Sequence, residues 1–187
     1  FSTYLQISTK IGQHPTAVLC TLAGDCCFNI KDMAHAKMAL SDARRFFEIG
    51  DSHKEQMEGW EEEMSAFAYS RSGDVAFIEK NYREATGYYQ EAEKRWKRVT
   101  TAHVAYNRAL VLYKESVSLA KSGQLDSAES KANQLIAYLN ENKNNEQVAK
   151  NRLNFLGKYA NTLREEGDWL ASASRSIQIG LARLKDN

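Results

Sequence analysis

The chain of 187 residues carries 25 Lys and Arg against 24 Asp and Glu, and a net charge of +1 gives it no overall attraction to nucleic acid or to an anionic membrane. Its 43% hydrophobic and 26% charged residues are typical of a globular protein rather than a disordered tail. Its apolar runs, such as residues 109–113, are far shorter than the roughly 20 residues that cross a bilayer, so we expect no membrane insertion, and a single proline, Pro15, favours an all-α fold.

The three cysteines indicate a reducing compartment. Their number is odd and Cys26 and Cys27 are adjacent, which fits neither a disulfide framework nor a CxxC metal pair. We therefore expect an intracellular, cytoplasmic protein. Cys20 and Cys27 are seven residues apart on one helix face, and all three cysteines are expected in the core as small hydrophobic residues.

The first predicted helix hairpin spans residues 17–50. Apolar or small residues recur in steps of three and four, which is the period of one helix face. They lie at Cys20, Ala23, Cys27 and Ile30, and again at Met33, Ala36, Leu40, Ala43 and Phe47. A short polar turn at Lys31 and Asp32 separates the two helices, so we expect them to pack antiparallel.

The second predicted hairpin spans residues 54–99. Its first helix begins in an acidic run, since acidic side chains suit a helix start, and it ends near Glu79. After a turn at Lys80 and Asn81, the second helix ends in a basic cluster that we expect to face the acidic run. The run comprises Glu55, Glu58, Glu61, Glu62 and Glu63; the cluster comprises Lys94, Arg95, Lys97 and Arg98; the apolar face between them comprises Tyr82, Ala85, Tyr89, Ala92, Trp96 and Val99.

Two more hairpins are predicted at residues 101–142 and 145–186, with turns at Gly123–Gln124 and Gly167–Asp168. The same period marks their helices. The apolar positions are Ala105, Ala109, Leu112, Ser116 and Leu119, then Leu125, Ala128, Ala132, Leu135 and Leu139, then Ala149, Leu153, Leu156, Ala160 and Leu163, and lastly Trp169, Ile177, Ile179 and Leu181.

Aligning the hairpins on their turns reveals a repeat. A small residue follows each turn, at Ala36, Ala85, Ala128 and Ser172, with intervals of 49, 43 and 44 residues. Twelve residues before each lies another small residue, at Gly24, Gly73, Ser116 and Ala160. We expect small residues to face each other where the two helices of a hairpin cross, because they let the backbones approach closely.

These residues resemble the tetratricopeptide repeat family. The match is clearest at Tyr69, Gly73, Tyr82, Ala85, Tyr89 and Ala92, which follow the family's aromatic, Gly, Tyr, Ala, aromatic, Ala order. The intervals exceed the family's usual length of about 34 residues, as in extended-repeat members such as kinesin light chains and bacterial peptide-sensing regulators. The resemblance implies a single αα-hairpin solenoid of nine antiparallel helices that is part of a longer protein, with residues 1–16 as the second helix of a truncated repeat.

In that family the first helices of the hairpins line a concave groove that binds peptides. The resemblance places the groove at eleven positions, which are Asp25, Phe28, Arg71, Asp74, Phe77, Tyr113, Lys114, Lys121, Lys158, Asn161 and Arg164. The early copies are acidic and the later ones basic. The hypothesis that follows is an extended peptide with its acidic part toward the C-terminal half of the groove.

Several groups of residues could bind a ligand or catalyse a reaction, but each also has a structural explanation. The basic and aromatic residues 95–98 could contact nucleic acid, but Trp96 continues the apolar face and the charges suit a helix C-terminus. Asp32 and His35 share a helix face, yet a metal site needs more ligands, and the cysteines lack an activating partner. We expect no metal, no cofactor, no nucleic acid and no catalysis.

The leading hypothesis for function is a scaffold or adaptor that binds a protein or peptide segment in the groove. The alternative is a peptide-sensing regulatory domain that controls an effector domain outside these residues. The last predicted helix lacks the polar outer face of a capping helix, so self-association through terminal helices is also open.

Overall fold

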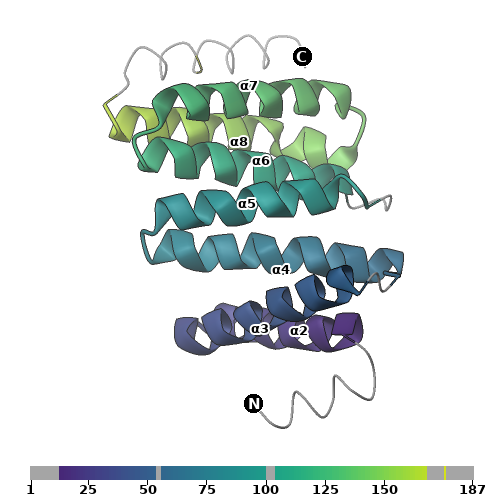
Figure 1. Ribbon diagram of the computed structural model, residues 1–187. Coiled ribbons are helices and arrows are strands. Elements are labelled where there is room, and N and C mark those ends of the chain that lie inside the picture. The colour runs from purple at the N-terminus through teal and green to yellow at the C-terminus, as the bar shows by residue number, and fades with distance from the viewer. Residues whose placement is uncertain (1–12, 54–55, 100–103, 168–174, 176–187) are drawn as a thin grey trace. The chain divides into compact units, whose positions relative to one another are not determined.

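The computed structural model describes residues 13–53, 56–99, 104–167 and 175. Within these residues the regular structure is entirely helical, which confirms the predicted all-α fold (Figure 1). The helices are α2 (Gln13–Asn29), α3 (Met33–Ser52), α4 (Gly59–Ile78), α5 (Tyr82–Trp96), α6 (Val104–Lys121), α7 (Leu125–Glu141) and α8 (Glu146–Glu165). The chain divides into two compact units, Phe1–Thr101 and Ala102–Asn187, which we call unit 1 and unit 2 and describe separately.

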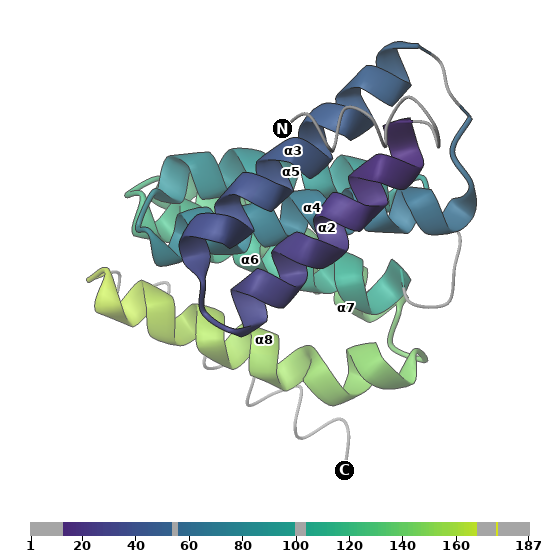
Figure 2. The ribbon, with the colours of Figure 1, turned by 90° about the horizontal axis from the view of Figure 1, so that it is seen from below.

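Unit 1 contains two antiparallel hairpins, α2 with α3 and α4 with α5 (Figure 2). The second hairpin stacks on the first through α4, which packs against both α2 and α3. The core joins Ala17 and Cys20 of α2, Ala43 and Phe47 of α3, and Ala68 of α4. Helix α4 therefore lies between its own partner α5 and the preceding hairpin.

Unit 2 repeats this packing in its described part. Helices α6 and α7 form a hairpin, and α8 packs against both of them. Its core brings Ala109 and Leu112 of α6, Leu135 and Leu139 of α7, and Phe155 of α8 into one cluster. The helix that follows α8 in the prediction, with Ser172, Trp169, Ile177, Ile179 and Leu181, lies outside the described residues, as does most of the segment 1–16.

The hairpin turns are the same in every copy and match the predicted turns. Lys31, Lys80, Gly123 and Gly167 all have a positive φ, at 65°, 63°, 78° and 84°. After α2, the amide of Lys31 donates to the Phe28 carbonyl (3.0 Å) and the amide of Asp32 to the Cys27 carbonyl (2.9 Å). The same two bonds follow α4 and α6, and they form the Schellman motif that closes a helix with a left-handed residue.

The glycines of the repeat make close contacts across their hairpins. A Cβ built on Gly24 would lie 2.7 Å from Cγ of Leu40, and one built on Gly73 would lie 2.4 Å from the ring of Tyr89. Each glycine thus makes room for a large side chain four residues beyond Ala36 or Ala85, a contact that the prediction did not include. The helices approach closely because one partner lacks a side chain and the other fills the space.

The boundary between the two hairpins of unit 1 also differs from the prediction. Helix α3 continues through Asp51 to Ser52, and α4 begins only at Gly59. The side chain of Glu61 accepts from the Glu58 amide (2.9 Å), in a capping box that fixes this start.

Pro15 lies in the first turn of α2, where a missing amide proton breaks no helical bond.

Candidate functional site

The predicted groove residues of unit 1 form a connected cluster on the first helices α2 and α4. Arg71 of α4 donates to Asp25 of α2 (Nε to Oδ1, 2.6 Å) and to Asp74 one turn further along α4 (Nη1 to Oδ2, 3.1 Å). Its guanidinium lies 4.8 Å from the ring centre of Phe28 and 5.0 Å from that of Phe67. A single arginine therefore ties the two first helices together between aromatic rings.

The rest of this cluster orients the two aspartates. The hydroxyl of Tyr89 donates to Oδ1 of Asp74 (2.9 Å), so Asp74 accepts on both oxygens. Phe77 packs edge-on against Tyr82 at a centroid distance of 5.1 Å. Arg71 thus bonds to both carboxylates, and half-buried rings lie beside them.

The predicted groove residues of unit 2 lie on α6 and α8. Tyr113 stacks on Phe155 at 5.4 Å, and burial raises the pKa of its hydroxyl. Lys121 at the end of α6 contacts Glu165 (2.9 Å) and Glu166 (2.8 Å) at the end of α8. The cation that Lys121 was expected to offer an acidic peptide is thus already shared by two carboxylates.

The remaining groove residues of unit 2 are open to solvent. Lys158, Asn161 and Arg164 are exposed along one side of α8, and Lys114 is half-buried on α6. In the repeat, Lys114 and Lys158 occupy the position that Arg71 holds in α4, fourteen residues before Ala128, Ser172 and Ala85. The first helices therefore carry a cation at the same place in three copies.

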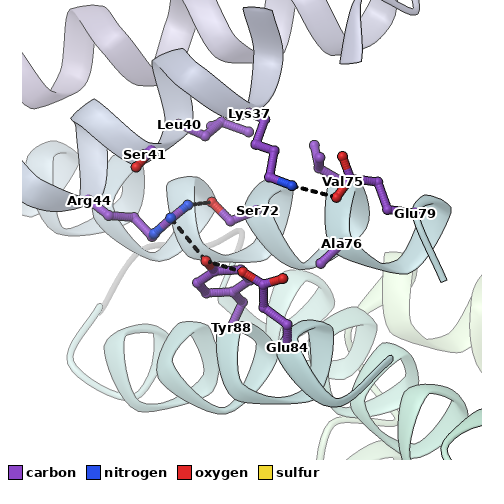
Figure 3. A pocket seen from close by; sticks show the side chains of 10 residues that line it. All are labelled: Lys37, Leu40, Ser41, Arg44, Ser72, Val75, Ala76, Glu79, Glu84 and Tyr88. Atoms are coloured by element: carbon purple, nitrogen blue, oxygen red, sulfur yellow. Dashed lines mark hydrogen bonds and ion pairs between the residues drawn. The ribbon is translucent and has the colours of Figure 1, made fainter. Parts of the chain in front are cut away.

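A hollow that the sequence did not predict lies between α3, α4 and α5 of unit 1 (Figure 3). Helices α3, α4 and α5 enclose a volume of about 190 Å³, lined by Lys37, Leu40, Ser41, Arg44, Ser72, Val75, Ala76, Glu79, Glu84 and Tyr88. Its signal in the sequence is weak, because these residues belong to three helices and share no motif.

The charges of this hollow are paired within it. Arg44 donates to Ser72 and to the hydroxyl of Tyr88 (3.1 Å), and its guanidinium lies 4.3 Å from the Tyr88 ring centre. Tyr88 in turn donates to Glu84 (2.9 Å), and burial and this bond raise its pKa, against the lowering influence of Arg44. Lys37 contacts Glu79 (2.7 Å). The network holds α3, α4 and α5 together.

The basic cluster at the end of α5 serves the fold. Trp96 and Arg95 are 2% and 6% exposed, so neither forms a nucleic-acid surface. Arg95 lies 4.7 Å from the Tyr69 ring centre and donates to Ser65 and to Asp51 (3.0 Å). Asp51 at the end of α3 is therefore one of its partners, and Arg95 and Arg98 also line a small hollow together with Glu62, so the basic cluster lies beside the acidic run as the sequence predicts.

The other candidate groups also have structural roles. Asp32 caps α3, since its side chain accepts from the His35 amide (3.2 Å) and contacts the His35 ring (2.7 Å), and these bonds lower its pKa. Cys20 is buried, and burial with nearby Asp42 raises the pKa of its thiol to about 11. Cys26 is exposed and Cys27 half-buried, which corrects their predicted place in the core.

The described part of the chain holds neither a metal cluster nor a membrane span. Nowhere in it do three or more His, Cys, Asp or Glu side chains gather closely enough to hold a metal ion. Its helices are also too short or too polar to span a bilayer.

No protein-family model matches the sequence, and no curated protein matches it significantly. The resemblance to tetratricopeptide repeats therefore depends on the residues and the hairpin geometry described above.

Proposed function

We propose that the chain is a protein-binding scaffold or adaptor of tetratricopeptide type, which holds a segment of a partner on the exposed faces of its first helices. In this proposal the hairpins continue into a superhelix of nine helices that includes the segments 1–12 and 168–186, since residues 13–16 belong to α2 rather than to a preceding helix as predicted. The protein acts in the cytoplasm and catalyses no reaction itself.

The repetition of the first-helix face in adjacent helices carries this proposal. Asp25 and Phe28 of α2 recur as Asp74 and Phe77 of α4 at an interval of 49 residues, and α4 packs directly on α2. Equivalent side chains therefore lie side by side on neighbouring helices. Such a periodic surface suits an extended segment, because each repeat can contact the next residues of the partner.

The charge of the face indicates what kind of segment fits each unit. Unit 2 presents Lys158 and Arg164 to solvent on α8, so acidic residues suit this unit. Unit 1 presents one arginine between two aspartates beside Phe28, so apolar and basic residues suit it. Lys121 contributes less than its formal charge, because Glu165 and Glu166 already contact it.

Selection of peptides on the whole chain tests this proposal. Random linear peptides would be displayed, selected for binding, synthesised and measured by calorimetry. Lys158→Glu should weaken the selected peptides by about tenfold, the effect of reversing one exposed charge opposite an acidic residue. Lys143→Glu is the matched control, since Lys143 is also exposed but lies in the turn between α7 and α8. Equal affinity for both variants, or selected peptides without acidic residues, would contradict the proposal.

A further inference from the structure

Two of the charges in the hollow between α3, α4 and α5 meet only through a neutral group. Arg44 donates to the hydroxyl of Tyr88 (3.1 Å), and that hydroxyl donates to Glu84 (2.9 Å). Within the described part of the chain, neither Arg44 nor Glu84 forms an ion pair. The other two charges, on Lys37 and Glu79, contact each other directly at 2.7 Å (Figure 3). The hollow therefore presents a cation and an anion that lie within two hydrogen bonds of each other.

The same repeat positions in unit 2 hold a direct ion pair. Ser72 and Tyr88 correspond to Glu115 and Lys131, which follow them at the interval of 43 residues that separates these two copies. Glu115 is buried and contacts Lys131 at 3.0 Å. In unit 1 a serine and a tyrosine take these places, so no ion pair fills the corresponding space beside Arg44.

The hollow has an apolar floor and a rim that is open to solvent. Leu40, Val75 and Ala76 line it and are buried, whereas Ser41 and Glu84 line it and are exposed. Its volume of about 190 Å³ can be compared with that of a cavity that binds benzene, which is roughly 150 Å³. The hollow therefore has room for a small ligand with a short apolar group.

The hollow lies near the hairpin turns of unit 1. Its lining residues come from positions 37–44 of α3, 72–79 of α4 and its turn, and 84–88 of α5. Residues 54–55 and 100–103 adjoin the opposite ends of these helices, and residues 1–12 precede α2, which does not line the hollow. The described residues alone thus define the site.

The charges around the hollow disfavour a ligand of a single sign. Glu79 and Glu84 repel an anion that approaches Arg44, and Arg44 and Lys37 repel a cation. A ligand with one charge of each sign avoids both repulsions. In an α-amino acid the ammonium nitrogen and the carboxylate oxygens are only about 3 Å apart, as the bond lengths require, which suits two opposite charges that share one hydroxyl.

We propose that the hollow binds a free α-amino acid with a short apolar side chain. Arg44 donates to the carboxylate, because its bonds to Ser72 and Tyr88 leave further N–H groups of the guanidinium available. Glu84 accepts from the ammonium group, and the side chain of the ligand lies on Leu40. This inference does not depend on the proposed peptide binding, since the cluster around Arg71 shares no residue with the hollow.

A nuclear magnetic resonance titration of the full chain with L-alanine and L-valine tests the inference. The amide signals of the lining residues should shift and saturate, with a dissociation constant on the order of 1 mM, because exposed ion pairs contribute little affinity. N-acetyl-L-alanine lacks the ammonium charge and L-alaninamide lacks the carboxylate. Each should bind about tenfold more weakly, the effect of losing one charged hydrogen bond.

Variants at the two charges show whether each recognises its half of the ligand. Arg44→Met should abolish the shifts, whereas Arg45→Met is the matched control, since Arg45 is the next residue of α3 but does not line the hollow. Glu84→Lys should invert the preference, so that N-acetyl-L-alanine binds more tightly than L-alanine. Glu141→Lys is its control, because Glu141 is also exposed but lies on α7 in unit 2.

Circular dichroism would establish that the variants are folded, and Glu84→Lys tests the inference even if Arg44→Met unfolds the chain. Four outcomes would overturn the inference. They are an absence of saturating shifts at the hollow, shifts confined to other residues, equal binding of L-alanine and its two blocked forms, and an unchanged preference in Glu84→Lys.

Discussion

The two units build the same hairpin with different side chains at its crossing point. In unit 1, Gly73 of α4 leaves space that the ring of Tyr89 fills, and Gly24 does the same for Leu40. In unit 2, the equivalent residues are Ser116 and Ala132, both buried. The repeat therefore specifies a close crossing of the two helices of a hairpin, and different pairs of side chains achieve it.

Both units bury charged side chains, and two of the buried pairs differ in how far the partner is exposed. Unit 1 buries the cation Arg95, whose partner Asp51 is one-third exposed at 33%. Unit 2 buries the anion Glu115, which is 1% exposed, against Lys131 at 3.0 Å. Since a buried charge depends on its partner more than an exposed one does, the pair in unit 2 should be the more sensitive.

Lys131→Met should have the largest effect. It removes the cation that Glu115 faces in the core of unit 2, and loss of one partner of a buried pair costs about 3–5 kcal/mol. The free energy of unfolding would be measured by urea titration. Adding Glu115→Leu should restore much of the loss, because no charge is then buried without its cation. Arg95→Met in unit 1 should cost less, since water can solvate Asp51; equal losses would remove this difference between the units.

Gly73→Ala should have the next largest effect. Its new Cβ would lie 2.4 Å from the Tyr89 ring, and overpacking of this kind costs about 1–3 kcal/mol. Gly87→Ala, in α5 of the same unit, is the control; nothing lies within 4 Å of its Cβ, so it should stabilise by up to about 1 kcal/mol.

A double-mutant cycle relates the Gly73 prediction to unit 2. Gly73→Ala together with Tyr89→Ala approaches the small pair that unit 2 uses, so the double variant should lose less stability than the sum of the two single changes. Thermal unfolding of the four proteins measures the difference. Strict additivity would show that the glycine and the ring do not share one space.

The repeat and its turns could be predicted from the sequence because they depend on local signals. The steps of three and four located six of the seven described helices, the acidic run located α4, and Lys80–Asn81 and Gly123–Gln124 located two of the turns. Whether a residue is buried depends on neighbouring helices, so burial was harder to predict from the sequence. Ala23 and Ile30 follow the apolar period predicted for the first helix but are exposed, because a helical period shows which residues share a face and not whether another helix covers it.

The predicted site also combines features that the repeat predicts with contacts that only packing determines. The repeat placed Asp25, Arg71 and Asp74 on one surface, and the structure connects them. It could not show that Lys121 is engaged by Glu165 and Glu166, or that Arg44 reaches Tyr88, because these contacts join residues 44 positions apart on different helices. Partners at that separation follow from packing, which no local pattern contains.

A smaller effect on stability is expected at the turns, where the two units use different residues. Unit 1 closes its hairpins with Lys31 and Lys80 at positive φ, whereas unit 2 uses Gly123 and Gly167. A residue with a side chain pays roughly 1 kcal/mol in this conformation and glycine does not. Lys80→Gly should therefore stabilise unit 1 and Gly123→Ala should destabilise unit 2, each by about 1 kcal/mol, in melting curves. Changes of the same sign in both would show that the turns differ in more than conformation.

The smallest effect on stability is expected at the ion pairs that join neighbouring first helices. Hydrogen bonds from Lys121 lower the pKa of Glu165, and those to Glu166 and Glu165 raise the pKa of Lys121. A lowered carboxyl pKa stabilises the fold above the ordinary value of 4.5, and this contribution is lost as the pH falls through the folded pKa. The raised amine pKa adds stability that is present below its ordinary value of 10.5 and is lost as the pH rises through the folded pKa.

Lys121→Met should therefore lower the melting temperature slightly at neutral pH, and the difference from the unmodified chain should shrink in acid. Salt should also reduce it, because Glu165 is 62% exposed and solvent ions screen such pairs. In unit 1 the corresponding tie joins Arg71 and Asp25, both 24% exposed and bonded at 2.6 Å. Arg71→Met should thus keep most of its effect at high salt, since a half-buried pair is screened less; an equal salt dependence would mean that solvent reaches both ties alike.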